Sequence, residues 1–398
     1  MLAVMRIHRI LAEASATLLK SVFRDGKVLD LEIAEAFQKN PKWGKRDRGF
    51  IAETVYEVAR WRRSLAFVAD SEEITSLCAA QWRRMGYELP DWWKYRGASA
   101  QVMEERESCL LEQPRAIRES IPDWLDDFVV KDMGEEQWEL ELKALNQKPR
   151  VVLRVNTLKC TREEAMVWLA ENGVMSKEVP GVPQALVLPE GKVLPKPLRF
   201  DGRVEIQDAG SQCIVPMLGA KPGEKVIDAC SGAGGKALQL AAEMNNEGRI
   251  YAMDIHEKKL KELKKRARRA GVRCIAPKLI TETTASDFAG VADRLLIDAP
   301  CSGLGTLRRQ PDLKWRLKPA AIFRAWEIQE ELLLEYSRML KPGGRLVYAT
   351  CSILDTENSF AVSELYGVGD FTLVEERRIS PANDGFDGFY AAALIKDQ

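Results

Sequence analysis

Apolar residues recur at helical spacing through the first part of the chain. The recurring positions are Ile7, Ile10, Leu11, Ala14, Leu18 and Val22, followed by Phe50, Ile51, Val55, Val58, Trp61 and Leu65. This repeat predicts amphipathic helices whose apolar faces pack together. Two more helices are predicted over 123–132 and 136–146. Residues 1–145 are therefore expected to form an all-helical region, in which the pattern leaves the order of helices over 75–115 open.

A small α/β unit is predicted to follow, over residues 146–208. Its expected elements are a strand at 151–156, a helix that begins after Thr161 and ends at Gly173, and two short strands at 184–188 and 203–207. Thr161 and Glu164 have the spacing of a capping box, in which each side chain accepts a hydrogen bond from the other residue's backbone amide. This order of elements is similar to that of a small RNA-recognition fold.

Beyond residue 209, short apolar strands alternate with helices. Strands are predicted at 224–230, 249–255, 294–300 and 345–351, with helices from about 236, over 258–269 and near 319–340. Uninterrupted apolar strands separated by helices are typical of a parallel sheet that is covered on both faces. Residues 209–398 are therefore expected to form an α/β domain with a doubly wound parallel sheet.

Composition narrows the class of protein. Apolar residues make up 46% and charged residues 30% of the chain, as in an ordinary globular protein, and no apolar run is long enough for a membrane span. Eight cysteines without paired spacing and only two histidines argue against a metal site and a disulfide framework. These features favour the reducing cytoplasm, without a secretory signal or a membrane partner. Because the formal net charge is zero, a nucleic-acid partner must be inferred from local patches.

A glycine-rich turn, DACSGAGG, follows the first strand of the α/β domain at residues 228–235. Glycines let the backbone turn tightly and approach a ligand, and the following helix N-terminus favours an anionic group. The turn alone is a weak signal, because many strand-to-helix connections resemble it. Asp254 ends the next strand, where a carboxylate can accept bonds from ribose hydroxyls, although it also suits the N-cap of the basic helix that follows. NAD and S-adenosylmethionine both fit this pattern.

Two cysteines stand at the ends of two later strands. Cys301 lies in DAPCSG, behind the strand that ends at Asp298, and Cys351 lies in YATCS. Ligands bind outside the carboxyl ends of such strands, and neighbouring strands lie about 5 Å apart, so two adjacent strands would bring both thiols to one crevice. A buried cysteine is often only a small apolar residue, and a redox pair is another alternative. Neither explains why both thiols occupy strand ends.

Such a pair of thiols suits methylation of a pyrimidine. Carbon 5 of a pyrimidine is a poor nucleophile, but a thiolate that adds to carbon 6 makes an enamine whose carbon 5 can attack a methyl sulfonium. The carbon 5 proton must then be removed and the thiol eliminated, a step that a second nearby group can assist. An acid such as Asp298 can hydrogen-bond the ring nitrogen or amine as charge develops.

Taken together, DACSGAGGK, DAPCSG and ATCS resemble the motif set of RNA cytosine-5 methyltransferases of the Sun/Nop family. The stretches LRVNTLK, QDAGSQ and RRQPDLKW are similar to its RsmB-like bacterial 16S ribosomal-RNA branch, and the resemblance covers about residues 120–365. It implies a Rossmann-like domain dependent on S-adenosylmethionine, with Cys351 as nucleophile and Cys301 assisting release. The implied cofactor contacts are Cys230, Ser231, Gly232, Ala233, Gly234, Gly235, Lys236, Asp254 and Asp298.

The resemblance extends more weakly to an N-terminal stretch, and two of the family's usual motifs differ in this sequence. The stretch GFIAETVYEVARWRRSL, residues 49–65, is similar to NusB-like RNA-binding helices. The glycine turn departs from the family's usual CAAPGGK, because Ser231, Gly232 and Ala233 replace its middle. The acid that usually follows the third strand has no clear counterpart, and either Thr281 or Glu282 is an alternative.

Basic residues suggest where RNA would bind. Arg154, Lys159, Arg308 and Arg309 are expected to track phosphates around the crevice. The helix over 258–269 carries eight lysines and arginines and one acid, and it is either part of this track or only a solvated face.

The sequence thus predicts a cytoplasmic, monomeric enzyme that uses S-adenosylmethionine to methylate carbon 5 of a cytosine in RNA, with ribosomal RNA as the expected partner and no metal. The alternative from another class is an RNA-binding assembly factor that keeps the fold without turnover. An NAD-dependent oxidoreductase has less support, since no hydride-transfer residues accompany the glycine turn.

Overall fold

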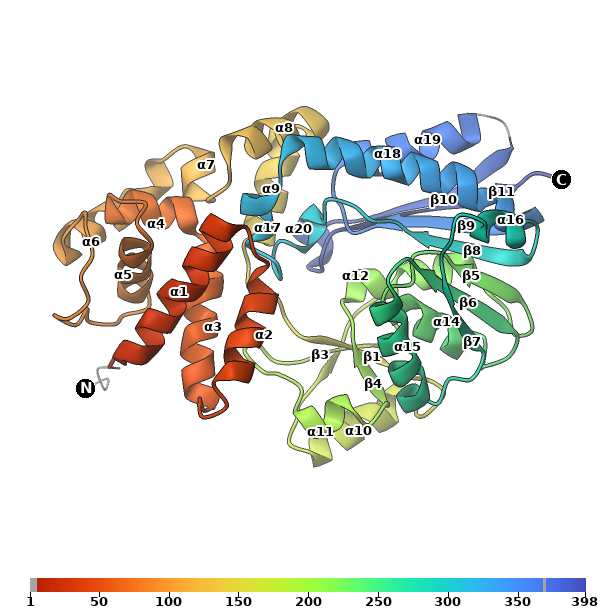
Figure 1. Cartoon of the computed structure of the whole chain (residues 1–398), viewed down its shortest axis with the longest axis horizontal. Coiled ribbons are helices and arrows are strands. Elements are labelled where there is room, and N and C mark those ends of the chain that lie inside the picture. The colour runs from red at the N-terminus through yellow and green to blue at the C-terminus, as the bar shows by residue number, and fades with distance from the viewer. Residues whose placement is uncertain (1–5, 368–369) are drawn as a thin grey trace. The chain divides into compact units, whose positions relative to one another are not determined.

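The computed structural model of this protein describes residues 6–367 and 370–398, and Figure 1 labels the elements. The chain forms two compact units. One contains the chain up to Gln147 together with Leu307–Pro319, and the other contains Lys148–Thr306 and Ala320–Gln398. No helix of the described residues is both long and apolar enough to cross a bilayer.

The first unit is helical, as predicted. Its helices are α1 (Arg9–Asp25), α2 (Leu29–Lys39), α3 (Lys45–Arg60), α4 (Arg62–Ala69), α5 (Ile74–Arg84), α6 (Ala100–Ser108), α7 (Arg115–Arg118), α8 (Asp123–Met133), α9 (Glu135–Leu145) and the short α17 (Leu313–Arg316). Most of the apolar positions that recur in the sequence are buried in one core, although Ile10 is 70% exposed. The region over 75–115, which the pattern left open, contains α5, α6 and a single 3-10 turn.

The segment Leu307–Pro319 packs within the helical unit, whereas the sequence predicted one continuous α/β domain over 209–398. The Arg308 guanidinium donates through Nε to the Ala144 carbonyl oxygen at 2.8 Å. The Lys314 ammonium is buried and donates to the Arg60 carbonyl oxygen, also at 2.8 Å. Burial lowers the pKa of Lys314 well below its usual range. These cations satisfy helix-end carbonyl groups, which explains why the segment leaves the α/β domain.

The second unit contains the small α/β part that was predicted. Its four-stranded antiparallel sheet has the order β2-β3-β1-β4, built from β1 (Val152–Val155), β2 (Lys177–Glu178), β3 (Ala185–Val187) and β4 (Val204–Ile206), with the helices α10 (Arg162–Glu171) and α11 (Lys196–Arg199). The predicted capping box is present. Thr161 Oγ1 accepts from the Glu164 amide at 3.2 Å, and Glu164 Oε2 accepts from the Thr161 amide at 2.8 Å.

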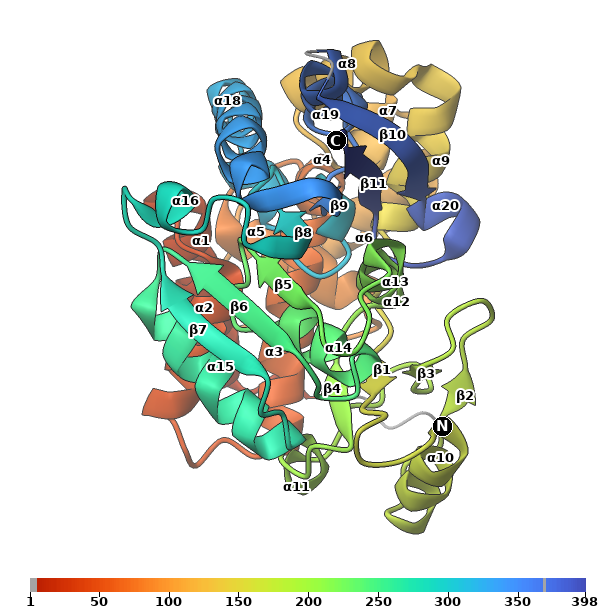
Figure 2. The same ribbon diagram turned by 90° about the vertical axis from the view of Figure 1, so that its right-hand side faces the viewer.

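The larger sheet has seven strands in the order β10-β11-β9-β8-β5-β6-β7 (Figure 2). The strands are β5 (Lys225–Asp228), β6 (Arg249–Asp254), β7 (Ile275–Leu279), β8 (Ala292–Asp298), β9 (Leu340–Thr350), β10 (Phe371–Ile379) and β11 (Phe389–Lys396). Strands β5, β6, β8 and β9 are parallel, as predicted, and β7 is a further parallel strand that the sequence did not predict. The sequence did not predict β10 and β11, which extend the sheet beyond β9. Strand β11 runs antiparallel to both of its neighbours, β9 and β10.

Helices cover both faces of this sheet. Its helices are α12 (Ala209–Gln212), α13 (Ile214–Leu218), α14 (Gly235–Glu243), α15 (Glu257–Ala270), α16 (Thr284–Asp287), α18 (Pro319–Tyr336), α19 (Ser359–Gly367) and α20 (Pro381–Asp384). Alternate strand residues face opposite sides, so that Val226 packs with α13, α14 and α15 while Ile227 packs with α18 and α19 (Figure 2). The doubly wound α/β architecture is thereby confirmed, and the carboxyl ends of β5, β6, β8 and β9 share one edge.

Candidate active site

The two cysteines at the strand ends meet. Strands β8 and β9 are parallel neighbours whose register pairs Asp298 with Ala349, so the chains that leave them start level. The sulfur atoms of Cys301 and Cys351 lie 3.3 Å apart, and both residues are half-buried. The pKa of the Cys301 thiol lies well above its usual range because of the bond to Cys351, burial and the nearby Glu357 carboxylate. The structure therefore brings the two candidate reacting groups into direct contact.

Glycine allows the loops around the thiols to close on one another. The Gly305 amide donates to the Cys351 carbonyl oxygen at 3.0 Å, and the Gly305 carbonyl oxygen accepts from the Gly388 amide at 2.8 Å. A methyl group on Gly305 would lie 2.1 Å from the Gly388 carbonyl oxygen. No side chain fits there, so this glycine is required for the close approach.

A buried acid that the sequence analysis missed lies behind the thiols. Glu357 is fully buried, and its carboxylate accepts hydrogen bonds from Ser302 and Ser352. These serines directly follow Cys301 and Cys351. The repeated Cys-Ser pair was the available sequence signal, but nothing local indicated that a glutamate farther along the chain would join the two serines.

Asp298, at the carboxyl end of β8, is paired with a buried lysine. The Lys236 ammonium, from the first turn of α14, donates to Asp298 Oδ2 at 2.7 Å. It also lies 5.5 Å from the ring centre of Phe389. The Lys236 side chain is 8% exposed and that of Asp298 is 30% exposed, so the carboxylate remains accessible while its cation is covered. Asp298 is therefore held by a covered cation, while part of its own side chain can still be reached from the site.

The glycine turn adopts a conformation that side chains disfavour. Gly232 and Gly234 have φ values of 56° and 86°. A methyl group on Gly234 would lie 2.7 Å from Leu263 Cγ, whereas one on Gly232 would have no neighbour within 4 Å. The turn is thus packed tightly on α15 at one glycine and open at another, as a cradle for a ligand must be.

Asp254 serves the turn and the start of α15 together. Its Oδ2 accepts from the Gly232 amide at 2.9 Å, and its Oδ1 accepts from the His256 amide at 2.7 Å. The N-cap of α15 is His256, so the N-cap interpretation of Asp254 is wrong by two residues, although the acid still binds the backbone just before the helix. Binding of a ribose by Asp254 stays a prediction.

Asp228 is a second acid that sequence reasoning passed over. It ends β5, is fully buried, and its oxygens have no well-formed hydrogen bond to the described residues. Burial raises the pKa of Asp228 to about 8, with the Asp298 charge adding to the rise, while Lys236 and the Cys230 amide act in the opposite direction. A carboxyl group left unsatisfied beside a glycine turn fits a ligand that brings positive charge or hydrogen-bond donors.

Two of the four arginines and lysines expected to track phosphates lie inside the protein, which corrects that expectation. Arg154 is 4% exposed, and its Nη1 donates to the Gly235 carbonyl oxygen at 2.6 Å. Burial lowers the pKa of Arg154 to about 10. Arg308 is 6% exposed and is bound within the helical unit, as described above. Lys159 is exposed and donates to the Asp201 carbonyl oxygen at 2.8 Å, and Arg309 is half-buried.

The basic helix α15 is partly a solvated face and partly turned inward, and its part in a phosphate track stays a prediction. Arg266 and Arg269 turn inward and bind the buried Glu205 of β4 at 3.0 and 2.8 Å. Arg266 also donates to the Ala233 carbonyl oxygen at 2.8 Å. The remaining six cations of this run are exposed.

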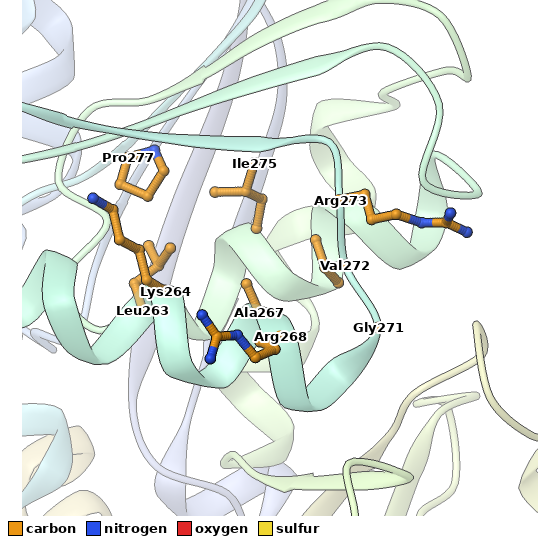
Figure 3. A pocket seen from close by; sticks show the side chains of 9 residues that line it. All are labelled: Leu263, Lys264, Ala267, Arg268, Gly271, Val272, Arg273, Ile275 and Pro277. Carbon is orange, nitrogen blue, oxygen red and sulfur yellow. The ribbon is translucent and has the colours of Figure 1, made fainter.

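A hollow of about 470 Å³ lies between α15 and β7 (Figure 3). Its lining residues are Leu263, Lys264, Ala267, Arg268, Gly271, Val272, Arg273, Ile275 and Pro277. Three of these carry positive charge, none carries negative charge, and none belongs to the residues around the thiols. The hollow is therefore a separate basic surface with an apolar floor.

Comparison with known proteins identifies relatives. A family model described as 16S rRNA methyltransferase RsmB/F matches residues 215–395, and a ferredoxin-like domain model of RsmF/B-like methyltransferases matches residues 121–193. A probable ribosomal RNA small subunit methyltransferase B from Synechocystis is 32% identical to this chain in an alignment 383 residues long. The alignment covers 86% of this chain and 85% of that protein.

Solved structures share the fold. The crystal structure of PH0851, at 24% identity, has a TM-score of 0.81 and covers 98% of this chain and 100% of its own. A methyltransferase homologue from Pyrococcus horikoshii, at 27% identity, has a TM-score of 0.64 and covers 72% of this chain and 98% of its own. The first of these likenesses concerns the fold alone.

The raised pKa of Asp228 predicts a dependence of stability on pH. The folded protein holds a proton at Asp228 that the unfolded chain releases, so the free energy of unfolding should fall as pH rises from about 4 to about 8. Asp228→Asn cannot ionise and should remove this fall. The variant should gain up to a few kcal/mol over the parent above pH 8, because each pKa unit corresponds to about 1.4 kcal/mol.

Urea unfolding at a series of pH values measures this difference. The exposed acid Asp287, which is in the same unit, gives the control Asp287→Asn. Parallel curves for the parent and Asp228→Asn would contradict a buried, protonated Asp228.

Proposed function

This chain belongs to the RsmB/F family of 16S rRNA methyltransferases, and we propose that it transfers a methyl group to carbon 5 of a cytosine in small-subunit ribosomal RNA. The observation that carries this proposal is the pair of thiols 3.3 Å apart at the carboxyl ends of β8 and β9. A single thiol suffices to add to a pyrimidine. A second thiol in contact with the first suits the reverse step, in which the base must be released.

S-adenosylmethionine is the cofactor of this fold and supplies a methyl group on positively charged sulfur. In our proposal Asp254 binds its ribose, and the backbone of the turn Cys230, Ser231, Gly232, Ala233, Gly234, Gly235 and Lys236 lies along it, with Asp298 at the reacting end. Two features support binding of this cofactor: the open space in front of Gly232 and the unsatisfied carboxyl group of Asp228.

Cys351 acts as the nucleophile in this scheme. Its thiolate adds to carbon 6 of the cytosine, and the electron pair displaced onto carbon 5 forms the new bond to the methyl group. A water molecule takes the proton from carbon 5, the electrons of that C–H bond restore the ring double bond, and the bond between Cys351 and carbon 6 breaks with its electron pair leaving on the Cys351 thiolate. The raised pKa of Cys301 favours its protonated form, which suits proton transfer during release better than attack.

Asp298 holds the base during these steps. Its carboxylate, paired with Lys236, can accept a hydrogen bond from the exocyclic amine of the cytosine during addition and methyl transfer. The base must be unpaired to reach the thiols, as in other enzymes that act on bases.

The RNA itself would meet the exposed Lys159, the half-buried Arg309 and the basic hollow beside α15. We place this activity in the cytoplasm, with a monomer as the acting form. The alternative, an RNA-binding assembly factor without turnover, does not explain why two thiols lie in contact at the strand ends. An NAD-dependent oxidoreductase has less support, because hydride transfer does not require two thiols in contact.

The two thiols should fail differently when removed. Cys351→Ala should abolish methylation and form no covalent complex, because no enamine can arise without its thiolate. Cys301→Ala should still attack and methylate, then stall as a protein–RNA adduct. Each variant is incubated with 16S ribosomal RNA and S-adenosylmethionine, and adducts are detected by denaturing electrophoresis.

Cys109→Ala removes an exposed cysteine and is the matched control, which should turn over as the parent does. An adduct with Cys351→Ala and none with Cys301→Ala would reverse the two roles. Undiminished methylation by both variants would refute the covalent mechanism.

Phosphate binding by the hollow predicts a change in salt dependence. Replacing Lys264, Arg268 and Arg273 by glutamine should lower the slope of log affinity against log salt by up to about 2, since each phosphate contact on a single strand contributes about 0.7. Fluorescence anisotropy with a labelled fragment of 16S ribosomal RNA, over a range of potassium chloride concentrations, measures the slope.

The control removes the same charge elsewhere. Arg9, Lys39 and Lys143 are exposed but already paired with Glu13, Glu35 and Glu139, so their replacement by glutamine should leave the slope unchanged. Equal slopes for the hollow variant and the parent would mean that these cations only solvate the surface.

A further inference from the structure

Glu357 connects the two loops that carry the thiols. It lies in a 3-10 turn, Asp355–Glu357, shortly after β9. Its Oε1 accepts from the Ser302 amide at 2.7 Å, and its Oε2 accepts from the Ser302 and Ser352 hydroxyls, each at 2.5 Å. One carboxylate thus holds the residue after Cys301 and the residue after Cys351.

The two hydroxyls are oriented for this purpose. Ser302 Oγ accepts from the Leu304 amide at 3.4 Å, and Ser352 Oγ accepts from the Leu354 amide at 3.1 Å. Because each hydroxyl has a single proton, these acceptor bonds leave that proton for Glu357. The serine side chains therefore point their protons at one shared oxygen.

The glutamate is itself held in place. The Tyr348 hydroxyl, on β9, donates to the Glu357 carbonyl oxygen at 2.7 Å. The neighbouring Asn358 accepts from the Thr350 hydroxyl at 2.6 Å and donates to the Ser352 carbonyl oxygen at 3.2 Å. Gln329 of α18 lies 3.4 Å from the carboxylate. The acid is consequently fixed to β9, and the loop carrying Cys301 is the part that it holds.

A role in packing alone does not account for this acid. An apolar side chain would fill the space without the cost of taking a carboxylate out of water. Burial raises the pKa of Glu357, while the bonds from both serines and the Ser302 amide oppose that rise. The cost of burial is offset first by the bonds to the two loops and then by the weaker bond from Gln329, so joining the loops is the main thing that the buried acid achieves.

We propose that Glu357 is a positioning residue that, through Ser302 and Ser352, holds the Cys301 and Cys351 thiols in contact so that the methylated base is released. The release step rests on the function proposed above, but the holding of the thiols does not. The two parts can therefore be tested separately.

The first test needs neither RNA nor cofactor. Diamide oxidises two neighbouring thiols to a disulfide and takes up their two hydrogens as its hydrazine form, so the rate of the Cys301–Cys351 disulfide reports how well the thiols are held together. The double variant Ser302→Ala with Ser352→Ala removes both hydroxyl links and keeps the bond from the Ser302 amide. Its rate should fall about tenfold, as expected when a reacting pair loses its alignment by about 1 Å.

Two further variants serve as an intermediate case and as a control for this measurement. Glu357→Gln keeps the shape and can still accept from the Ser302 amide, so its rate should fall less than that of the double variant. Ser286→Ala removes an exposed serine that bonds only within its own turn, at the Thr283 carbonyl oxygen, and should match the parent. The disulfide is identified by mass spectrometry of peptides digested without reductant, since the chain has six other cysteines. A double variant that forms it at the parental rate would overturn the proposal.

The second test follows release. With 16S ribosomal RNA and S-adenosylmethionine, the double serine variant should methylate in a first turnover but accumulate adduct, and its steady-state rate should fall about tenfold. A variant that was merely less stable would lose the first turnover and the steady state in equal proportion, and that result would overturn the proposal. If the parent forms no methylcytosine at all, the proposed function fails, whereas the diamide result still decides whether Glu357 holds the thiols.

Discussion

Parallel pairing between β8 and β9 is the constraint on which the rest of the site depends. Two strands about 5 Å apart, with Asp298 level with Ala349, deliver their following residues to the same place. An offset of one residue would turn the side chains of one strand to the other face of the sheet. The contact between the Cys301 and Cys351 thiols is therefore a property of the sheet's register first, and the loops refine it through Gly305 and Glu357.

The glycine turn is supported from outside the large sheet. Its Ala233 and Gly235 carbonyl oxygens are bound by Arg266 and Arg154, and Arg266 in turn binds the buried Glu205 of the small sheet. Removing Glu205 would take the carboxylate away from two half-buried arginines, Arg266 and Arg269, which costs more than a fully exposed ion pair contributes. The small α/β part thus stabilises the cofactor turn directly, and Arg154 and Arg266 act on backbone atoms that no sequence motif distinguishes.

Regular patterns predicted what regular structure determines. Alternating apolar strands and helices located β5, β6, β8 and β9, and their order placed both thiols and Asp254 at one edge, because the carboxyl ends of parallel strands meet there. Glu357 and Asp228 were not identified as site residues from the sequence, because their importance depends on burial. The presence of an acidic residue in a sequence does not show whether it is buried. Arg154 and Arg308 were taken for surface cations for the same reason. The departure of Leu307–Pro319 into the helical unit depends on partners such as the Ala144 carbonyl oxygen, which are far away in sequence.

Two identical side chains can have different roles only if their surroundings differ. The bond between the sulfurs and burial raise the pKa of the Cys301 thiol, and the Glu357 carboxylate adds to this effect. When one thiol of a contacting pair ionises, the other becomes harder to ionise, so the pair holds one thiolate and one thiol in preference to two thiolates. A single thiolate with an adjacent proton donor is what addition followed by elimination requires. In the proposed scheme, these surroundings favour Cys301 as the proton donor and leave Cys351 as the thiol that attacks.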